Sequence, residues 1–143
     1  MDNSIELLEK TLRKNNVFVT NARKTVFLAL LNSEPRTMQE LESRINSKIN
    51  RTSIYRVIEL FIGLGIVHKI QIGWKYKIEL SDIFIEHHHH ISCIKCGKLI
   101  SVHEHGEIER FINKVTQKYG YTNTSHQLEI QGVCSNCKII RAR

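Results

Sequence analysis

The stretch EHHHHISCIKCGK, residues 86–98, concentrates side chains that bind metals: four consecutive histidines stand just before a Cys-x-x-Cys pair. A second such pair follows at residues 134–137, and the two pairs hold all four cysteines of the chain. Thiolates spaced in this way can converge on one tetrahedral zinc ion and fill all of its coordination positions. We therefore predict a structural zinc site formed by Cys93, Cys96, Cys134 and Cys137.

A redox dithiol is the alternative interpretation of these pairs, and inert thiols are a third. A redox Cys-x-x-Cys motif usually begins a helix in a βαβ unit. Here Cys93 is expected to end a strand, and Gly97 to follow the pair in a tight turn. Paired cysteines of a cytoplasmic chain more often bind metal than form disulfides, so the spacing favours zinc.

The four histidines are expected to lie on a β-strand, where successive side chains point to opposite faces. His87 and His89 would share one face, and His88 and His90 the other. The run can therefore contribute two ligands to each of two metal sites. A solvated polar strand without a metal is the alternative, but four adjacent imidazoles serve no evident packing purpose, and burying them without partners would be unfavourable.

The elements around these motifs predict an α+β protein with two domains. In residues 1–80, apolar residues recur at helical spacing over 4–14, 22–30, 37–45 and 54–62, and Thr37 with Glu40 has the pattern of a capping box. Two β-like runs follow at 66–72 and 75–80, which completes a winged helix-turn-helix domain. Residues 81–86 are expected to form a hinge.

Residues 87–143 are predicted to form a small α/β domain that carries the metal-binding motifs. Two strands are expected at 87–94 and 98–105, a helix at 106–120 and a further strand at 126–134. The helix has an apolar face that includes Phe111 and Val115, which we expect to point inward.

Charge and hydropathy restrict the function classes. The chain carries 21 Lys or Arg against 14 Asp or Glu, and residues 1–80 hold 13 of the basic and 8 of the acidic residues. A basic N-terminal half favours a polyanion as partner. The chain has no apolar run long enough for a membrane span and no signal-peptide core at its N-terminus. We expect a soluble, cytoplasmic protein.

Taken together, these motifs resemble the Fur family of metal-dependent transcriptional regulators. The matching segments are VTNAR, TSIYRVIELFIGLGIV, HHHHISCIKCGK and HQLEIQGVCSNC, in the family's order and over nearly the whole chain. The resemblance implies a homodimer with an N-terminal winged helix on double-stranded operator DNA. It also implies that a metal ion in the hinge region fixes the two DNA-binding heads at the spacing of the operator.

The resemblance also assigns metal ligands. It places the four cysteines in the structural zinc site, and a further set, His87, His89, Glu109 and His126, in an additional site of the dimerisation domain. For the sensory site it implies His88 and His90 together with Glu79 at the end of the wing. His68 lies where zinc-uptake regulators draw a ligand from the wing, so the sensory set becomes His68, Glu79, His88 and His90.

Two departures from the iron-sensing branch favour zinc over ferrous iron as the regulatory metal. Residues 32–37 contain no histidine, and Ser101 stands where that branch often has an acidic residue. An aspartate at position 79 or 101 would be expected in a peroxide-sensing member, so that branch is disfavoured.

The helix after residues 46–50 is expected to enter the major groove with its N-terminal end. Tyr55 could contact thymine methyl groups, and Arg56 could reach guanine or phosphate. Partial packing in the core is the alternative role for Tyr55. The predicted DNA-contacting residues are Lys14, Arg23, Arg51, Thr52, Ser53, Tyr55 and Arg56.

These expectations lead to a metal-dependent repressor of metal-uptake genes, with zinc or ferrous iron as corepressor and with no catalytic residues, small-molecule substrate or membrane partner. A zinc-dependent enzyme is one alternative, but it would need an open coordination position beside a general base, and no motif such as HExxH occurs. A metal-buffering protein is another, although it would not need the wing or its basic charge.

Overall fold

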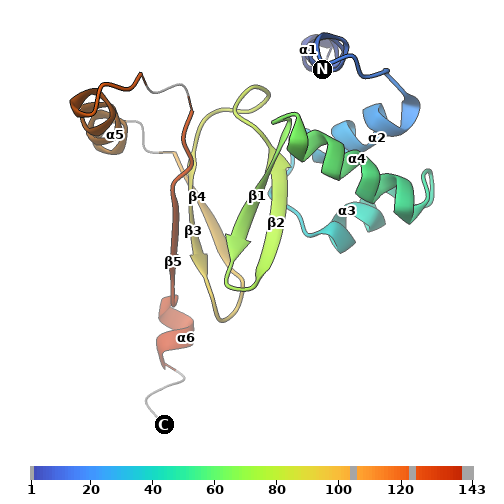
Figure 1. The fold of residues 1–143 in the computed structure, drawn as a ribbon. Helices are drawn as coiled ribbons and strands as arrows, with labels where there is room; N and C mark the ends of the chain where they lie inside the picture. The colour runs from blue at the N-terminus through green and yellow to red at the C-terminus, as the bar shows by residue number, and fades with distance from the viewer. Residues whose placement is uncertain (1, 104–105, 123–124, 140–143) are drawn as a thin grey trace. The chain divides into compact units, whose positions relative to one another are not determined.

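The computed structural model describes residues 2–103, 106–122 and 125–139 of the chain (Figure 1). The chain divides into two compact units. The first comprises Met1–Ile70 and Tyr76–Glu86, and the second comprises Gln71–Lys75 and His87–Arg143. In the described part of the chain, no helix is long and apolar enough to cross a membrane. The observed elements confirm the predicted α+β class.

Four helices form most of the first unit: α1 (Asp2–Lys14), α2 (Asn21–Leu30), α3 (Met38–Ile45) and α4 (Arg51–Gly63). The predicted capping box at the start of α3 is present: Thr37 Oγ1 accepts from Glu40 N at 3.1 Å, and Thr37 N donates to Glu40 Oε2 at 2.7 Å. At the start of α4, Asn50 Oδ1 accepts from Ser53 N at 2.8 Å. These caps satisfy backbone N–H groups that a helix leaves unpaired at its start.

The helices are held together by a core that lies wholly within the first unit. Its largest fully buried side chains include Phe27, Phe61, Leu8 and Leu41. The wing hairpin, β1 (Val67–Ile72) and β2 (Lys75–Leu80), turns at Gly73, where φ is +61°. The chain before α3 joins the hairpin, because Arg36 and Ile78 exchange two backbone hydrogen bonds of 2.9 and 2.7 Å.

Residues 81–86, which the sequence suggested as a hinge, fold onto the first unit. Phe84 N donates to Ser81 O at 2.9 Å, and the Phe84 ring meets Phe27 edge-on with centroids 5.0 Å apart. This segment is therefore ordered by core packing.

The second unit is built on a three-stranded sheet with the order β4-β3-β5. The strands are β3 (His89–Cys93), β4 (Leu99–Val102) and β5 (Glu129–Gly132); β3 pairs antiparallel with β4 and parallel with β5. The expected hairpin is confirmed, but β3 begins at His89, and residues 104–105 of the expected second strand lie outside the described residues. Helix α5 (Glu107–Lys118) was predicted, whereas α6 (Ser135–Ile139) was not.

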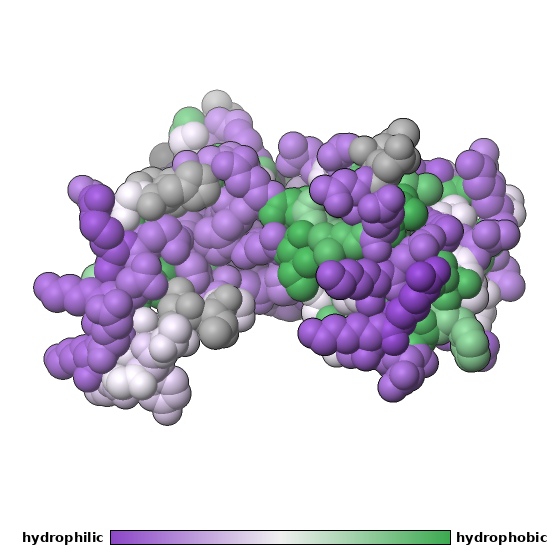
Figure 2. All heavy atoms as spheres, turned by 90° about the horizontal axis from the view of Figure 1, so that it is seen from above, coloured by the Kyte–Doolittle hydropathy of each residue, from purple (hydrophilic) through white to green (hydrophobic). Residues whose placement is uncertain are grey.

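Large apolar side chains of the second unit remain exposed in this single chain. Phe111 and Val115 of α5 are 67% and 38% exposed, which contradicts the expectation that they point inward. Three isoleucines, Ile91, Ile100 and Ile130, are 40–48% exposed and lie directly opposite one another across the sheet. Figure 2 shows one face of the molecule, on which hydrophobic patches interrupt a mainly hydrophilic surface.

Candidate metal centres and DNA-contact helix

Four cysteine sulfurs converge in the second unit. Cys93 ends β3, Cys96 lies in the turn after it, Cys134 precedes α6 and Cys137 lies within α6. Their Sγ atoms all lie within 4.8 Å of one another, and those of Cys96 and Cys134 are 3.8 Å apart. Sulfurs at ~2.3 Å from a tetrahedral zinc ion lie ~3.8 Å from one another. The thiols therefore fit zinc in number, chemistry and spacing.

The backbone around the cysteines shapes their ionisation. Gly97 has a φ of +74°, and its N–H donates to Cys93 O at 2.9 Å, which closes the turn. The N–H of Cys134 donates to Cys93 Sγ at 3.4 Å. This contact and the N–H of Cys96 lower the pKa of the Cys93 thiol to about 6.

The pKa of Cys137 shifts in the opposite direction, upward. Its hydrogen bond with Cys134, followed by burial, raises the pKa of the Cys137 thiol to about 12. The protein alone therefore does not favour four thiolates together, and a divalent cation would supply the missing positive charge.

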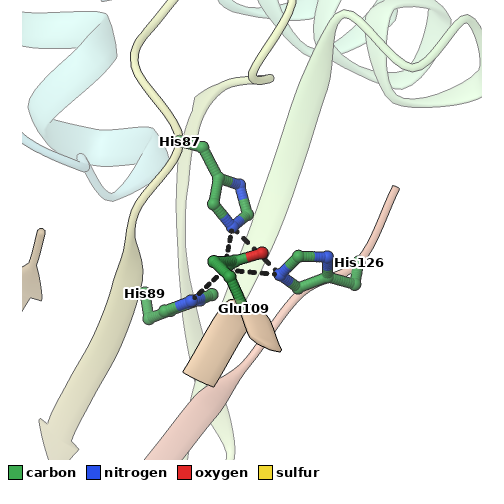
Figure 3. Close-up of polar contacts among 4 residues, drawn as sticks. All are labelled: His87, His89, Glu109 and His126. Atoms are coloured by element: carbon green, nitrogen blue, oxygen red, sulfur yellow. Dashed lines mark hydrogen bonds and ion pairs between the residues drawn. The ribbon is translucent and has the colours of Figure 1, made fainter. Parts of the chain in front are cut away.

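A second cluster joins three imidazoles to one carboxylate (Figure 3). The Nε2 atoms of His87, His89 and His126 lie 3.2, 2.9 and 3.1 Å from Glu109 Oε1. His87 lies just before β3 and His89 begins it, Glu109 comes from the first turn of α5, and His126 from the segment before β5. Three separate parts of the second unit thus meet at one oxygen atom.

Several physical features of this cluster fit a metal ion. Burial opposes ionisation of Glu109, but the hydrogen bond from His89 and the charge of His126 outweigh it, and the pKa of this carboxyl lies below its usual value. The Nε2 atoms of His87 and His126 are only 3.0 Å apart. Nitrogen and oxygen ligands at ~2.0–2.1 Å from a tetrahedral zinc ion lie about 3.3–3.4 Å apart. The four atoms would need only a slight expansion to surround such an ion.

The other two histidines of the run share the opposite side of β3. The rings of His88 and His90 are 4.7 Å apart at 77°, and His90 is 6% exposed. The alternation expected of a strand therefore extends to His87 and His88, although the hydrogen-bonded ladder starts only at His89. Both members of this expected sensory pair lie in the second unit.

The remaining members of the expected sensory set lie in the first unit. His68 is half-buried on β1, and Glu79 is 8% exposed on β2. Both strands belong to the wing hairpin, where the sequence had placed these residues.

One histidine on this side of the sheet was not among the ligands predicted from the sequence. His103 follows β4, and its ring stacks on that of His88, with centroids 5.3 Å apart and an interplanar angle of 28°. Strand parity puts positions 101 and 103 on the same face of one strand, but which residues of β3 lie beside them depends on the register between the two strands.

The N-terminal end of α4 carries most of the expected DNA-contacting residues. Arg51, Thr52 and Arg56 are exposed, and Ser53 is half-buried. Tyr55 is also half-buried and packs against the core of the first unit, so the packing role that the sequence left open is present. The guanidinium of Arg51 lies 5.5 Å from the centre of the Tyr55 ring.

Ion pairs and hydrogen bonds engage some of these basic groups. Arg51 Nε lies 3.2 Å from Glu42 Oε1 on α3, with 75% of the Arg51 side chain exposed. Arg23 donates from its side chain to Phe18 O and from its backbone to the cap residue Thr20. Lys14 is exposed in the last turn of α1.

Comparisons with known proteins agree with this architecture. The model of the ferric uptake regulator family matches residues 14–131. The peroxide-responsive repressor PerR of Staphylococcus epidermidis is 31% identical over 144 residues, which cover 96% of this chain and 93% of the relative. A ferric uptake regulation protein of Neisseria meningitidis serogroup A is 36% identical over 94 residues, or 64% of this chain and 62% of the relative.

A solved structure of similar fold is the ferric uptake regulator Fur of Helicobacter pylori, which is described as having three functional metal-binding sites. It matches with a TM-score of 0.76 and 25% identity, over 96% of this chain and 93% of that one. The chain therefore belongs to the ferric uptake regulator family of metal-responsive transcriptional regulators.

Proposed function

We propose that this protein is a homodimeric, metal-dependent repressor that binds operator DNA upstream of metal-uptake genes, with zinc rather than ferrous iron as corepressor. The observation that carries the proposal is that one chain combines an exposed, basic helix start on a winged helix with separate thiolate and imidazole clusters. Since its partner is DNA and no catalytic group is invoked, we expect it to act in the cytoplasm and not as an enzyme.

The cysteine cluster has a structural role in this proposal. Cys93, Cys96, Cys134 and Cys137 would hold one zinc ion with no open position, so the site cannot bind and activate water. The ion would join the end of β3 to α6, which lie far apart in sequence. Because ligand binding of this kind is coupled to folding, its free energy would stabilise the second unit.

The histidines have the regulatory role. By family resemblance, His88, His90, His68 and Glu79 would hold the sensory ion. The second set, which Figure 3 draws, would bind another ion in the dimerisation domain. Zinc is favoured because both sets are rich in imidazole, which suits zinc, whereas oxygen-rich sets suit harder cations.

Regulation would follow from preferential binding. An ion changes a conformational equilibrium only by binding one arrangement of the protein better than another. Ligands drawn from both the wing and the strand after residues 81–86 would bind best in one arrangement of the DNA-binding domains. That arrangement would be the one matched to the two half-sites of an operator.

DNA contact would centre on the start of α4. Arg56 and Thr52 would face base edges in the major groove, Arg51 and Ser53 would lie at the mouth of the groove, and the ring edge of Tyr55 would meet thymine methyl groups. Lys14 and Arg23 would meet the phosphate backbone.

The dimer would use the apolar face of the second unit. Ile91, Ile100 and Ile130 form one row across the sheet, and Phe111 adds an exposed aromatic ring on α5. An exposed apolar row of this kind commonly marks an interface. A second copy of this chain is the occupant that family membership supports, and twofold symmetry would pair each face with itself.

The test is binding of the purified protein to promoter fragments of metal-uptake genes from its host, with and without metal. Operator affinity should rise strongly when zinc is added at a buffered free concentration, and scrambled DNA should bind weakly with or without zinc. A response to ferrous iron alone would reverse the choice of metal. Tight metal binding without any change in DNA affinity would instead support a buffering protein and refute the proposal.

A further inference from the structure

His103 lies on the same face as His88 and His90. In the β3–β4 pair, His89 is opposite Val102 and His90 is opposite Ser101, so the next pair outward is His88 with His103. Residues directly opposite each other in an antiparallel pair project on the same side of the sheet, with Cβ atoms about 4.5–5.5 Å apart. The backbone therefore brings three imidazoles to one face of the hairpin.

The ring positions agree with this register. His88 lies between the other two rings, with its centroid 4.7 Å from that of His90 and 5.3 Å from that of His103. His90 is buried, His88 is half-buried and His103 is exposed. The exposed ring can change its side-chain torsions without disturbing packed neighbours, so its nitrogen could turn toward an ion held by the other two.

The residue opposite His90 offers no comparable ligand. Ser101 has a neutral hydroxyl group at the position where an acidic residue would have provided a carboxylate. Moving two residues along β4 keeps the same face and reaches His103. An imidazole on this strand could therefore take the place of the missing oxygen ligand.

The donor chemistry of such a face is distinctive. Two histidines at i and i+2 on one strand, with a third on the neighbouring strand, supply three ring nitrogens, and imidazole nitrogen is a common zinc ligand. Replacing a carboxylate with an imidazole also shifts preference away from harder, oxygen-preferring cations.

We propose that His103 is a third imidazole ligand of the metal site formed by His88 and His90, and that it takes the role which Ser101 cannot fill. This inference rests on the proposed regulatory metal site. It adds a ligand that was not assigned from the sequence. The hairpin of the second unit would then contribute three ligands to this site: His88, His90 and His103.

The test measures zinc affinity of the full chain by chelator competition. The starting variant carries Glu109→Ala and His126→Ala, which removes the neighbouring cluster, and the four cysteines are kept saturated with zinc. Adding His103→Ala should weaken zinc binding at the remaining site by at least about 10–100-fold, the range seen when even a supporting partner of a ligand is lost. Ser101→Ala, on the same face of β4, is the matched control and should change little.

A second measurement uses the unmodified clusters, in case the starting variant folds poorly. Long-range ¹H–¹⁵N spectra of histidine-labelled wild type should show one His103 ring nitrogen shifting on zinc binding together with those of His88 and His90. A rescue variant, His103→Ala with Ser101→Glu, should recover affinity and bind ferrous iron or manganese better relative to zinc.

The outcomes separate the two proposals. If His88→Ala and His90→Ala weaken zinc binding while His103→Ala does not, and the His103 ring signals stay unshifted, the third ligand is refuted and the regulatory site stands. If none of the three changes zinc affinity, the regulatory site on this face is refuted as well.

Discussion

Replacing Cys137 with serine should unfold the second unit at a much lower temperature. Structural zinc sites contribute about 10–16 kcal/mol of binding free energy in small domains, so one of four comparable thiolates corresponds to roughly 2.5–4 kcal/mol. The second unit has little else to compensate: among described residues, its buried hydrophobic side chains are Ile72 and Cys93. None of the residues of α5 is buried.

The expected melting shift follows from the size of the unit. In a domain of 60–100 residues, 1 kcal/mol corresponds to about 4–8 °C in Tm, so the loss of one thiolate should lower the transition by roughly 10–30 °C. Circular dichroism would follow the melt, elemental analysis would follow zinc content, and light scattering would follow the dimer mass. Because the core of the first unit contains none of these cysteines, its helical transition should persist.

Asn136→Ser is the matched control, since it introduces the same side chain at an exposed neighbouring position in α6 without removing a sulfur. Its melting temperature and zinc content should equal those of the wild type. If Cys137→Ser kept full zinc content, wild-type melting and an intact dimer, the structural role of the site would be refuted.

Three further predictions concern DNA, dimerisation and the two histidine faces. Arg56→Ala should weaken operator binding at fixed salt by roughly 1–3 kcal/mol with unchanged zinc content, as measured by fluorescence anisotropy; an equal loss on scrambled DNA would show a nonspecific contact. Ile91→Asp should weaken the dimer by about 0.6–1.2 kcal/mol per protomer, because an interface would bury only the 40% of Ile91 that is exposed in the single chain. Burying an unpaired carboxylate adds a further cost, and an unchanged dissociation constant in sedimentation would place the interface elsewhere. His90→Ala should leave a folded dimer whose DNA binding no longer responds to zinc, whereas His89→Ala should lower stability and retain part of the response. If DNA titrations showed that His89→Ala abolishes the zinc response and His90→Ala keeps it, the two faces would be wrongly assigned.

Much of the first unit could be predicted, because helix caps and the spacing of apolar residues indicate the same helices that the core packs together. The capping box at Thr37 and the apolar spacing of the helices each point to the same element boundaries. Tyr55 remained ambiguous, because a residue near a helix start can both pack inward and keep a polar edge exposed.

The second unit was harder to predict because its elements are short and its contacts are long-range. Helix α6 has only five residues, which are too few to show a helical period in the sequence. It also contains Cys137, which was predicted as a zinc ligand and not as part of a helix. The place of His103 depends on the register between β3 and β4, which the turn at Gly97 sets and which the sequence alone left open. Phe111 was predicted to be a core residue but is exposed in the single chain. The sequence pattern of an apolar helix face does not tell whether the face packs against its own chain or against another copy.

The two units differ in what packs them together. The first unit has a continuous apolar core that packs its four helices together. The described part of the second unit has two buried hydrophobic side chains, Ile72 and Cys93, together with four converging sulfurs, a carboxylate shared by three imidazoles and an exposed apolar row. Metal binding and subunit association, as proposed, would therefore stabilise the same structure, because anything that binds only the folded form adds its free energy to that form. The stability of the second unit should accordingly depend on free zinc and on protein concentration, while that of the first unit should depend on neither.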